Sequence, residues 1–102
     1  MTPAVPVSIY VLDGHEPVPC NSFVTFNRFL STANPLGVAR DTVGNVRVCS
    51  VFVAICSETP ARLFETTIFG GAHDRHCVRA ETWDECLRNH AQALRMIGAG
   101  SP

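Results

Sequence analysis

The stretch VRVCSVFVAIC, residues 46–56, decides the fold of this chain. Apolar residues occupy both of its alternating sides, and the run is rich in β-branched residues, which favour strands. A strand that is apolar on both sides is typical of a sheet covered on both faces. Polar segments bound the run, with a turn at Val43-Gly44-Asn45 before it and the loop SETPAR, 57–62, after it. The sequence therefore predicts a central strand here.

The segment LFETTIF, residues 63–69, predicts a second strong strand, which Gly70-Gly71 ends. Because the loop SETPAR is short, the two strands should form an antiparallel hairpin. Glu65 lies within this strand, where a charge either faces solvent or pairs across the hairpin with a residue such as Arg47. A further short strand is expected from His76 to Ala80.

The N-terminal part predicts a strand followed by a short helix. Val5, Val7, Ile9 and Val11 alternate in a half-buried strand that ends at Leu12. The stretch DGHEPVPC, 13–20, reads as a turn that stops this strand. Asn21 or Ser22 can cap a helix with phenylalanines at 23, 26 and 29, and Asn34-Pro35 ends it.

The C-terminal part predicts a long amphipathic helix. Thr82-Trp83-Asp84-Glu85 matches a capping box, in which the threonine and the glutamate satisfy backbone donors reciprocally. An apolar stripe at helical spacing follows, made of Trp83, Leu87, His90, Ala91, Leu94 and Ile97. The expected fold is one α+β domain over residues 1–102, with 98–102 as a frayed tail. It has about four antiparallel strands, this helix on one face of the sheet and a short helix after the first strand.

Composition narrows the function. With 102 residues, 46% of them apolar, the chain can bury one core, and its net charge of −1 gives no basic field for general nucleic-acid binding. All eight basic residues are arginines, which fits GC-rich coding DNA. We expect neither a signal peptide nor a membrane span. Five cysteines without a disulfide spacing are expected to be reduced thiols in a cytoplasm.

A zinc site is one interpretation of the stretch GGAHDRHCVRAETWDECLRNH, residues 70–90. Cys86 and His90 lie four residues apart on one helical face, and His73, His76 or Cys77 could complete a tetrahedral site. However, no CxxC or HxxxH pair occurs, and buried cysteines pack like small hydrophobic residues. We therefore expect packed thiols, with no metal and no cofactor.

Catalytic interpretations find little support in the sequence. Cys49 and Cys56 lie in the most apolar run, where a cysteine is inert. Cys77 beside His76 is the best candidate for a nucleophile, whereas the adjacent pair His73 and Asp74 is typical of a solvated loop. Gly70-Gly71 lacks the lysine and the helix of a phosphate-binding loop. We expect no enzyme.

Four motifs together resemble a family of small proteins encoded by phages and prophages of high-GC bacteria. They are LDGHEPVPC at 12–20, RVCSVFVAI at 47–55, LFETTIFGG at 63–71 and RAETWDECLRNH at 79–90. The family pattern has a PVPC turn, a strand RVSTVFLGLDH, the segment LFETMVFGG and a helix R-Y-S-T-W-E-E-A that ends in Gly-His. Order and spacing agree from Leu12 to His90. The matching positions are Pro17, Pro19, Cys20, Leu63, Phe64, Glu65, Thr66, Phe69, Gly70, Gly71, Thr82, Trp83, Glu85 and His90.

One departure from the family pattern concerns polar residues. Where the pattern has an Asp-His pair, this chain has Cys56-Ser57 and a shorter loop without a glycine run. A function of that pair would be lost here. The resemblance implies a genomic context and no reaction.

The resulting hypothesis is a non-enzymatic phage-type accessory protein that binds and inhibits a host macromolecule in the host cytoplasm. Antiphage defence, CRISPR effectors included, is the expected target class. One alternative is a small-ligand protein in which Arg47, Arg62 and Arg79 hold a nucleotide signal; another is a cysteine- or histidine-dependent enzyme or zinc module. The expected binding residues are Glu65, Arg62, His73, Asp74 and Arg75. We also expect a homodimer, formed through a sheet face that the first helix leaves uncovered or through an unpaired strand edge.

Overall fold

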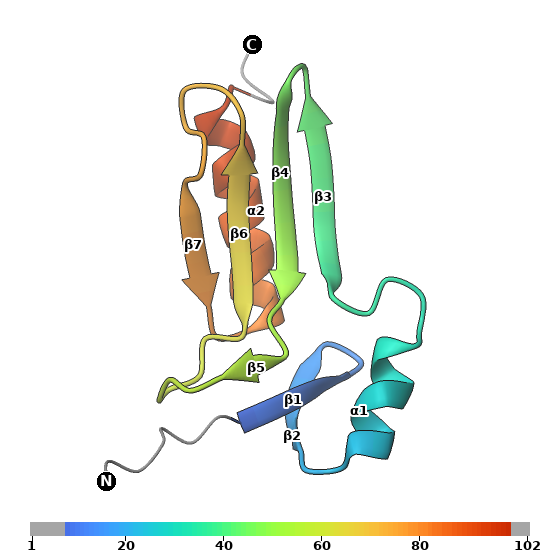
Figure 1. The fold of residues 1–102 in the computed structure, drawn as a ribbon. Helices are drawn as coiled ribbons and strands as arrows, with labels where there is room; N and C mark the ends of the chain where they lie inside the picture. The colour runs from blue at the N-terminus through green and yellow to red at the C-terminus, as the bar shows by residue number, and fades with distance from the viewer. Residues whose placement is uncertain (1–7, 99–102) are drawn as a thin grey trace, which may run out of the picture.

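The computed structural model describes residues 8–98, which form two antiparallel sheets and two helices (Figure 1). The elements are β1 (Ser8–Asp13), β2 (Glu16–Cys20), α1 (Phe23–Leu30), β3 (Gly37–Val43), β4 (Val46–Phe52), β5 (Ile55–Cys56), β6 (Phe64–Phe69), β7 (Cys77–Ala80) and α2 (Trp83–Met96). Strand order is β2-β1-β5 in the small sheet and β3-β4-β6-β7 in the large one. The expected α+β class is confirmed. No helix within residues 8–98 is long and apolar enough to cross a membrane.

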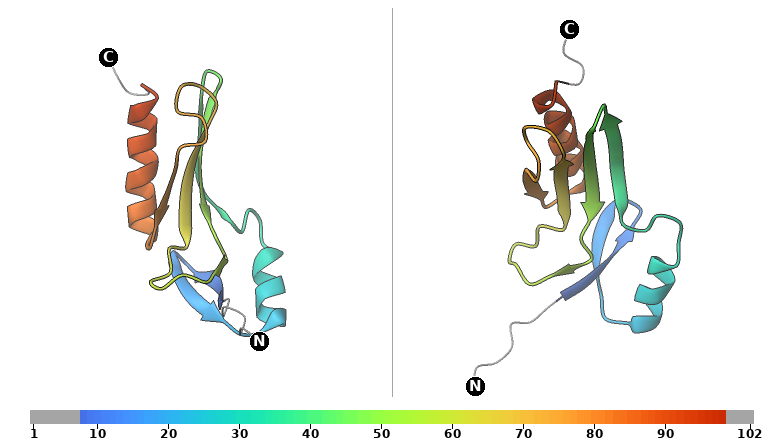
Figure 2. Two further views of the ribbon diagram at one scale, coloured as in Figure 1. Left: turned by 60° about the vertical axis from the view of Figure 1, so that its left-hand side comes forward. Right: turned by 45° about the horizontal axis from the view of Figure 1, so that its top comes forward.

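The main core lies between the large sheet and α2, which runs along one face of the sheet (Figure 2). Alternate residues of the two central strands point toward this helix, because successive side chains of a strand lie on opposite faces. The buried residues on this side are Val48, Ser50 and Phe52 of β4, Phe64, Thr66 and Ile68 of β6, and Ala80 of β7. Both central strands therefore contribute equally to the support of α2.

Helix α2 begins as expected but presents a partly different stripe to the sheet. The Thr82 hydroxyl accepts the Glu85 amide proton at 3.1 Å, which confirms the N-cap. The expected stripe holds at His90, which is buried, and at Trp83, Leu94 and Ile97, which pack against the core. It is wrong at Leu87, which is 41% exposed, and Cys86 and Ala93 are buried instead. The hydrogen bonds of His90 to Ser50 and Asp41 hold this side of the helix on the sheet.

The run 46–56 is not one strand. Its first part is β4, which ends at Phe52. The chain then continues as β5, where Ile55 and Cys56 pair with β1 in the other sheet. The run is therefore apolar on both sides partly because it serves two sheets. The expectation that both faces of β4 are covered is wrong, since the side chains of Arg47 and Val51 are exposed on the side away from α2.

Two strands lie where none was expected. The stretch 13–20 is a hairpin rather than a turn, with Gly14 at φ 63° in its two-residue loop and β2 after it. The prolines at 17 and 19 are tolerated because β2 is an edge strand. Strand β3 forms the edge of the large sheet beside β4. Val5 and Val7 of the expected first strand lie outside the described residues.

Helix α1 follows the second strand and is shorter than expected. Ser22 caps it by accepting the Thr25 amide proton at 3.3 Å, and it ends at Leu30, before Asn34-Pro35. None of its residues is buried. Phe26 and Phe29 pack against the core near Phe52, at the end of the large sheet. The helix therefore does not cover the free face of β4 and β6 (Figure 2).

The expected antiparallel pairing of the two strong strands is confirmed, but the expected ion pair is not. Glu65 lies opposite Val51 on β4 and opposite Arg79 on β7, whereas Arg47 lies opposite Phe69. Glu65 therefore pairs with Arg79, at 3.6 Å between Oε2 and Nε.

Candidate functional site

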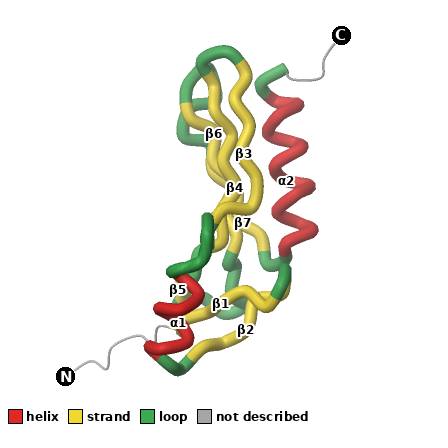
Figure 3. The backbone as a smooth tube through the Cα atoms, turned by 90° about the vertical axis from the view of Figure 1, so that its right-hand side faces the viewer, coloured by secondary structure: helices red, strands yellow, loops and turns green. Residues whose placement is uncertain are grey.

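The face of the large sheet turned away from α2 is the main candidate surface, and we call it the open face. Strand register arranges its side chains in three rows: Thr42, Arg47 and Phe69; Arg40, Cys49, Thr67 and Cys77; Val51, Glu65 and Arg79. None of these residues is buried. Within residues 8–98 no element lies over them, as the views along the sheet show (Figures 2 and 3).

The row nearest the small sheet ends in a network of four charges. Glu58 in the loop after β5 accepts from Arg62 Nε at 2.9 Å and from Arg79 Nη1 at 2.8 Å, and Arg79 also lies beside Glu65. The hydrogen bond from Arg62 holds the pKa of Glu58 below its usual value, and the same bond raises the pKa of Arg62. The charges at this end of the open face are therefore largely neutralised within the chain.

Two further arginines lie on the open face beyond this network, Arg40 in the middle row and Arg47 in the row at the opposite end. Among residues 8–98, neither Arg40 nor Arg47 has a carboxylate within 4.0 Å. Arg47 lies beside the ring of Phe69, which is 47% exposed, in a hollow of about 480 Å³ that Thr42, Asn45 and Gly70 also line. Arg40 lines a second hollow of about 550 Å³ between β3 and β4. This part of the face is therefore positively charged and uneven.

Gly70 keeps the end of β6 close to the turn between β3 and β4. Its φ is +93°, and a Cβ at this position would lie 2.7 Å from the Asn45 carbonyl oxygen. A larger residue would push the strand end away from the turn and open the hollow beside Arg47.

The three arginines proposed to hold a nucleotide do not converge. Arg47 and Arg79 lie in the two outer rows, opposite Phe69 and Glu65 of the same strand. Four residues separate those two positions, which is about 13 Å along a strand. Arg62 and Arg79 are both bound by Glu58. The structure therefore does not assemble this site.

The other expected binding residues divide between the two ends of β6. Arg62 lies in the loop before the strand, and His73, Asp74 and Arg75 lie in the loop after it (Figure 1). Asp74 accepts the Gly70 amide proton at 2.6 Å, so its carboxylate shapes this loop. Arg75 has φ 69° and a side chain that is 89% exposed. The two loops therefore flank the open face.

A second polar site lies beneath α2, where sequence reasoning did not place one. His90 Nδ1 is 2.7 Å from Ser50 Oγ, and His90 Nε2 is 2.8 Å from Asp41 Oδ2 on β3. Ser50 Oγ is also 2.6 Å from Thr66 Oγ1, which is 3.8 Å from Cys86 Sγ. A chain of hydrogen bonds thus runs from a surface carboxylate into the core. The sequence signal was the polar Ser50 and Thr66 at inward positions of two apolar strands.

The proton positions along this series of hydrogen bonds follow from the Asp41 carboxylate at its outer end. The Asp41 carboxylate can only accept, so His90 Nε2 carries a proton, and in the neutral ring Nδ1 accepts from the Ser50 hydroxyl. Ser50 Oγ then accepts from Thr66, whose oxygen can accept from the Cys86 thiol. Burial raises the pKa of Cys86, which keeps that proton on the sulfur. Every side chain in this buried series therefore has a hydrogen-bond partner.

Ser50, His90 and Asp41 resemble a catalytic triad in composition but differ from one in two respects. A triad serine bonds to Nε2 and the carboxylate to Nδ1, and here the two nitrogens are exchanged. Ser50 is also only 1% exposed, so substrate cannot reach its hydroxyl in this structure. These residues fix α2 on the sheet.

The residues of the zinc interpretation are not gathered around one point. Both ring nitrogens of His90 are occupied by Ser50 and Asp41, while Cys86 contacts Thr66. His73, His76 and Cys77 are exposed. In the part of the chain that is described, no group of three His, Cys, Asp or Glu side chains is arranged to hold a metal ion.

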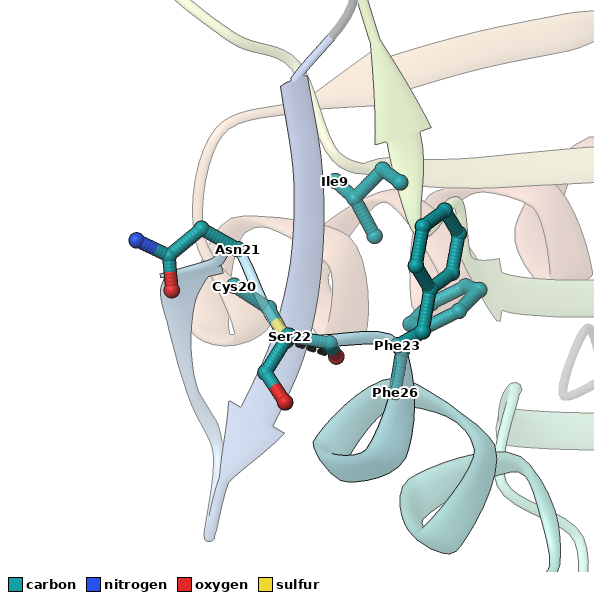
Figure 4. A pocket seen from close by; sticks show the side chains of 6 residues that line it. All are labelled: Ile9, Cys20, Asn21, Ser22, Phe23 and Phe26. Carbon is teal, nitrogen blue, oxygen red and sulfur yellow. Dashed lines mark hydrogen bonds between the residues drawn. The ribbon is translucent and has the colours of Figure 1, made fainter.

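A small apolar hollow of about 90 Å³ lies between the small sheet and the first turn of α1 (Figure 4). It is lined by Ile9, Cys20, Asn21, Ser22, Phe23 and Phe26. The Cys20 thiol bonds within this wall to the Ser22 carbonyl oxygen at 3.4 Å. The lining has no charged side chain that could hold a phosphate or a carboxylate.

No family model, curated protein or solved structure matches this chain. A function therefore has to be sought in the geometry of the chain's own residues.

Proposed function

We propose that this chain is a non-enzymatic binding protein that engages an acidic surface of a host protein through the open face. One observation carries the proposal: a four-stranded sheet has one face buried under a helix, while no element within residues 8–98 covers the other face, on which Arg40 and Arg47 lie. The flanking loops, with Arg62, His73, Asp74 and Arg75, would extend this surface.

The residue types on the open face support a protein partner. Arginine and aromatic residues are enriched at protein interfaces and supply much of their binding energy. Phe69, Val51 and Arg47 offer such side chains on a rigid sheet. The two arginines without partners favour an acidic surface.

A second copy of the chain is a poorer occupant of this face. A symmetric contact that stacks like ends of the open face would place Arg40 and Arg47 against the same arginines of the second copy, and like charges repel across an interface. A homodimer stays a prediction for the free edges of β3 and β7.

The target class rests on the resemblance to phage and prophage proteins. A small phage protein of this kind is suited to block a host function by binding. Components of antiphage defence, CRISPR effectors included, are the first partners to test.

The experiment is capture of host proteins on the immobilised full chain, with two glutamate substitutions compared. Thr67→Glu places a negative side chain at the centre of the open face, where it repels an acidic surface. Leu87→Glu places the same side chain on the solvent side of α2 as the matched control. Partners bound by the parent are identified, and their affinity for each purified variant is then measured.

We expect Thr67→Glu to abolish binding of the partner and Leu87→Glu to leave it unchanged, with both variants melting near the parent temperature. A partner that binds Thr67→Glu as tightly as the parent would exclude the open face.

A further inference from the structure

We infer that the partner contacts Arg40 and Arg47 with two carboxylates carried on alternate residues of one extended segment. This inference rests on the proposed function of the open face. It specifies the chemistry of the segment that lies over β3 and β4, and its spacing.

Arg40 and Arg47 differ from the other arginines of the chain. Arg62, Arg75 and Arg79 each lie within 4.0 Å of a carboxylate, and Arg95 donates to Gln92. Arg28 and Arg88 lie on the helices, away from the open face. Only Arg40 and Arg47 combine a place on the open face with the lack of an acidic partner.

Their placement has an electrostatic cost. Arg40 lies opposite Cys49, and Arg47 is two residues from Cys49 on the same strand, so the two arginines are diagonal neighbours. A guanidinium keeps its charge at any physiological pH, and adjacent like charges on a sheet are destabilising. A bound pair of carboxylates would remove this repulsion and would gain two charge-assisted hydrogen-bonded contacts.

The spacing of the pair fits an extended chain. Diagonal neighbours on an antiparallel sheet lie about 7–8 Å apart. Alternate residues of a strand lie about 6.6–6.8 Å apart and point to the same side. Each arginine also lines its own hollow, of about 550 Å³ for Arg40 and about 480 Å³ for Arg47. Two acidic side chains of one extended segment can therefore each reach one of the two arginines.

Carboxylates fit this surface better than the phosphates of a nucleic acid. Phosphate-backbone binding needs a basic field, whereas this chain has a net charge of −1 and places Glu65 and Glu58 at the other end of the same face. Sequence-tolerant single-strand binding also uses several stacked aromatic rings, and the open face offers Phe69 alone. A partner with a few discrete negative charges matches the two arginines.

The test uses short capped peptides and the full chain labelled with ¹⁵N. The probe is Thr-Glu-Thr-Glu-Thr, and its neutral control is Thr-Gln-Thr-Gln-Thr. We expect the glutamate peptide to shift the Nε–H signals of Arg40 and Arg47 and the amide of Phe69, and the glutamine peptide to shift none of them. Arg40→Gln and Arg47→Gln should each weaken binding by about fivefold or more, and Arg88→Gln, a substitution on α2, should not.

Three outcomes would overturn the inference. The first is that the glutamate peptide does not bind. The second is that Thr-Glu-Glu-Thr-Thr, in which the two glutamates are adjacent, binds as tightly as the probe. The third is that a short oligothymidylate binds more tightly than the probe, which would assign the arginines to phosphates. The proposed function is judged separately with the captured partner. If Thr67→Glu loses the partner but Arg40→Gln and Arg47→Gln keep it fully, the open face stands and the carboxylate contact falls.

Discussion

His90 and Ser50 show how buried polar side chains can fix the position of a helix on a sheet. The Thr82 cap was predictable, because its signal lies within four consecutive residues. The contact of His90 with Ser50 and Asp41 was not, because these residues are 40 and 49 positions apart and no local rule pairs them. For the same reason the sequence could not identify Arg79 as the partner of Glu65, because it does not specify the register of the strand that carries Arg79.

Ser50→Ala tests how much the buried hydrogen bonds of Ser50 contribute to the stability of the fold. The substitution leaves His90 Nδ1 and the Thr66 hydroxyl without their partner in the core. An unsatisfied buried group costs about 1–3 kcal/mol, and about 1 kcal/mol lowers Tm by roughly 4–8 °C in a domain of this size. Thermal unfolding of Ser50→Ala, His90→Leu and the double variant should show a smaller loss in the double variant than the sum of the single losses. Additive losses would mean that the two side chains do not interact.

Glu58→Gln tests the charge network at the surface. The hydrogen bond from Arg62 lowers the pKa of Glu58, so the network stabilises the folded state above the usual carboxyl pKa of 4.5. This contribution is lost as the pH falls below that value and through the lower folded pKa. The parent should melt at a higher temperature than Glu58→Gln at pH 7, and the two should converge once the pH is below the lowered pKa of Glu58. A constant difference across this range would rule out the ionised Glu58 as the source.

Helix α2 and the two central strands were predictable as elements, because their periodicity and propensity agree. What the sequence left open was how the elements face one another. Apolar residues on both sides of 46–56 suggested a strand covered twice, but the run leaves the large sheet after Phe52 and enters the small one as β5. Strands β2 and β3 were not predictable, because prolines in β2 and charged residues in β3 mask the alternation of apolar and polar residues. Edge strands tolerate such residues.

Two substitutions test the docking of α2. Trp83 stacks on His15 with ring centroids 3.9 Å apart and meets the edge of Phe64, so Trp83→Ala removes contacts to both sheets. We expect a loss of about 3 kcal/mol, the lower end for such truncations because Trp83 is only partly buried. Thr82→Ala should cost about 1 kcal/mol through its lost cap. Denaturant titration measures both, and a silent Trp83→Ala would mean that the helix start is not docked.

The whole molecule is more extended than its length requires. Its radius of gyration is 15.4 Å, whereas a compact domain of this length has about 13 Å. The large sheet projects beyond the small sheet and α1, with one face under α2 and the other free (Figure 3). This shape leaves much surface for a partner. Because α2 covers one face of the large sheet, the surface available to a partner is the open face.

Native cysteines offer the most direct test, because Cys49 and Cys77 lie on the open face while Cys20 lies on β2. Desolvation by the neighbouring side chains raises the pKa of Cys77 although the residue is exposed, so alkylation should be run at mildly alkaline pH, where more thiolate forms. Mass spectrometry then compares alkylation rates at each cysteine in the free chain and in the complex with the captured partner. The open-face account predicts strong protection of Cys49 and Cys77 in the complex and an unchanged rate at Cys20. Equal alkylation of Cys77 in the free and bound chain would contradict it.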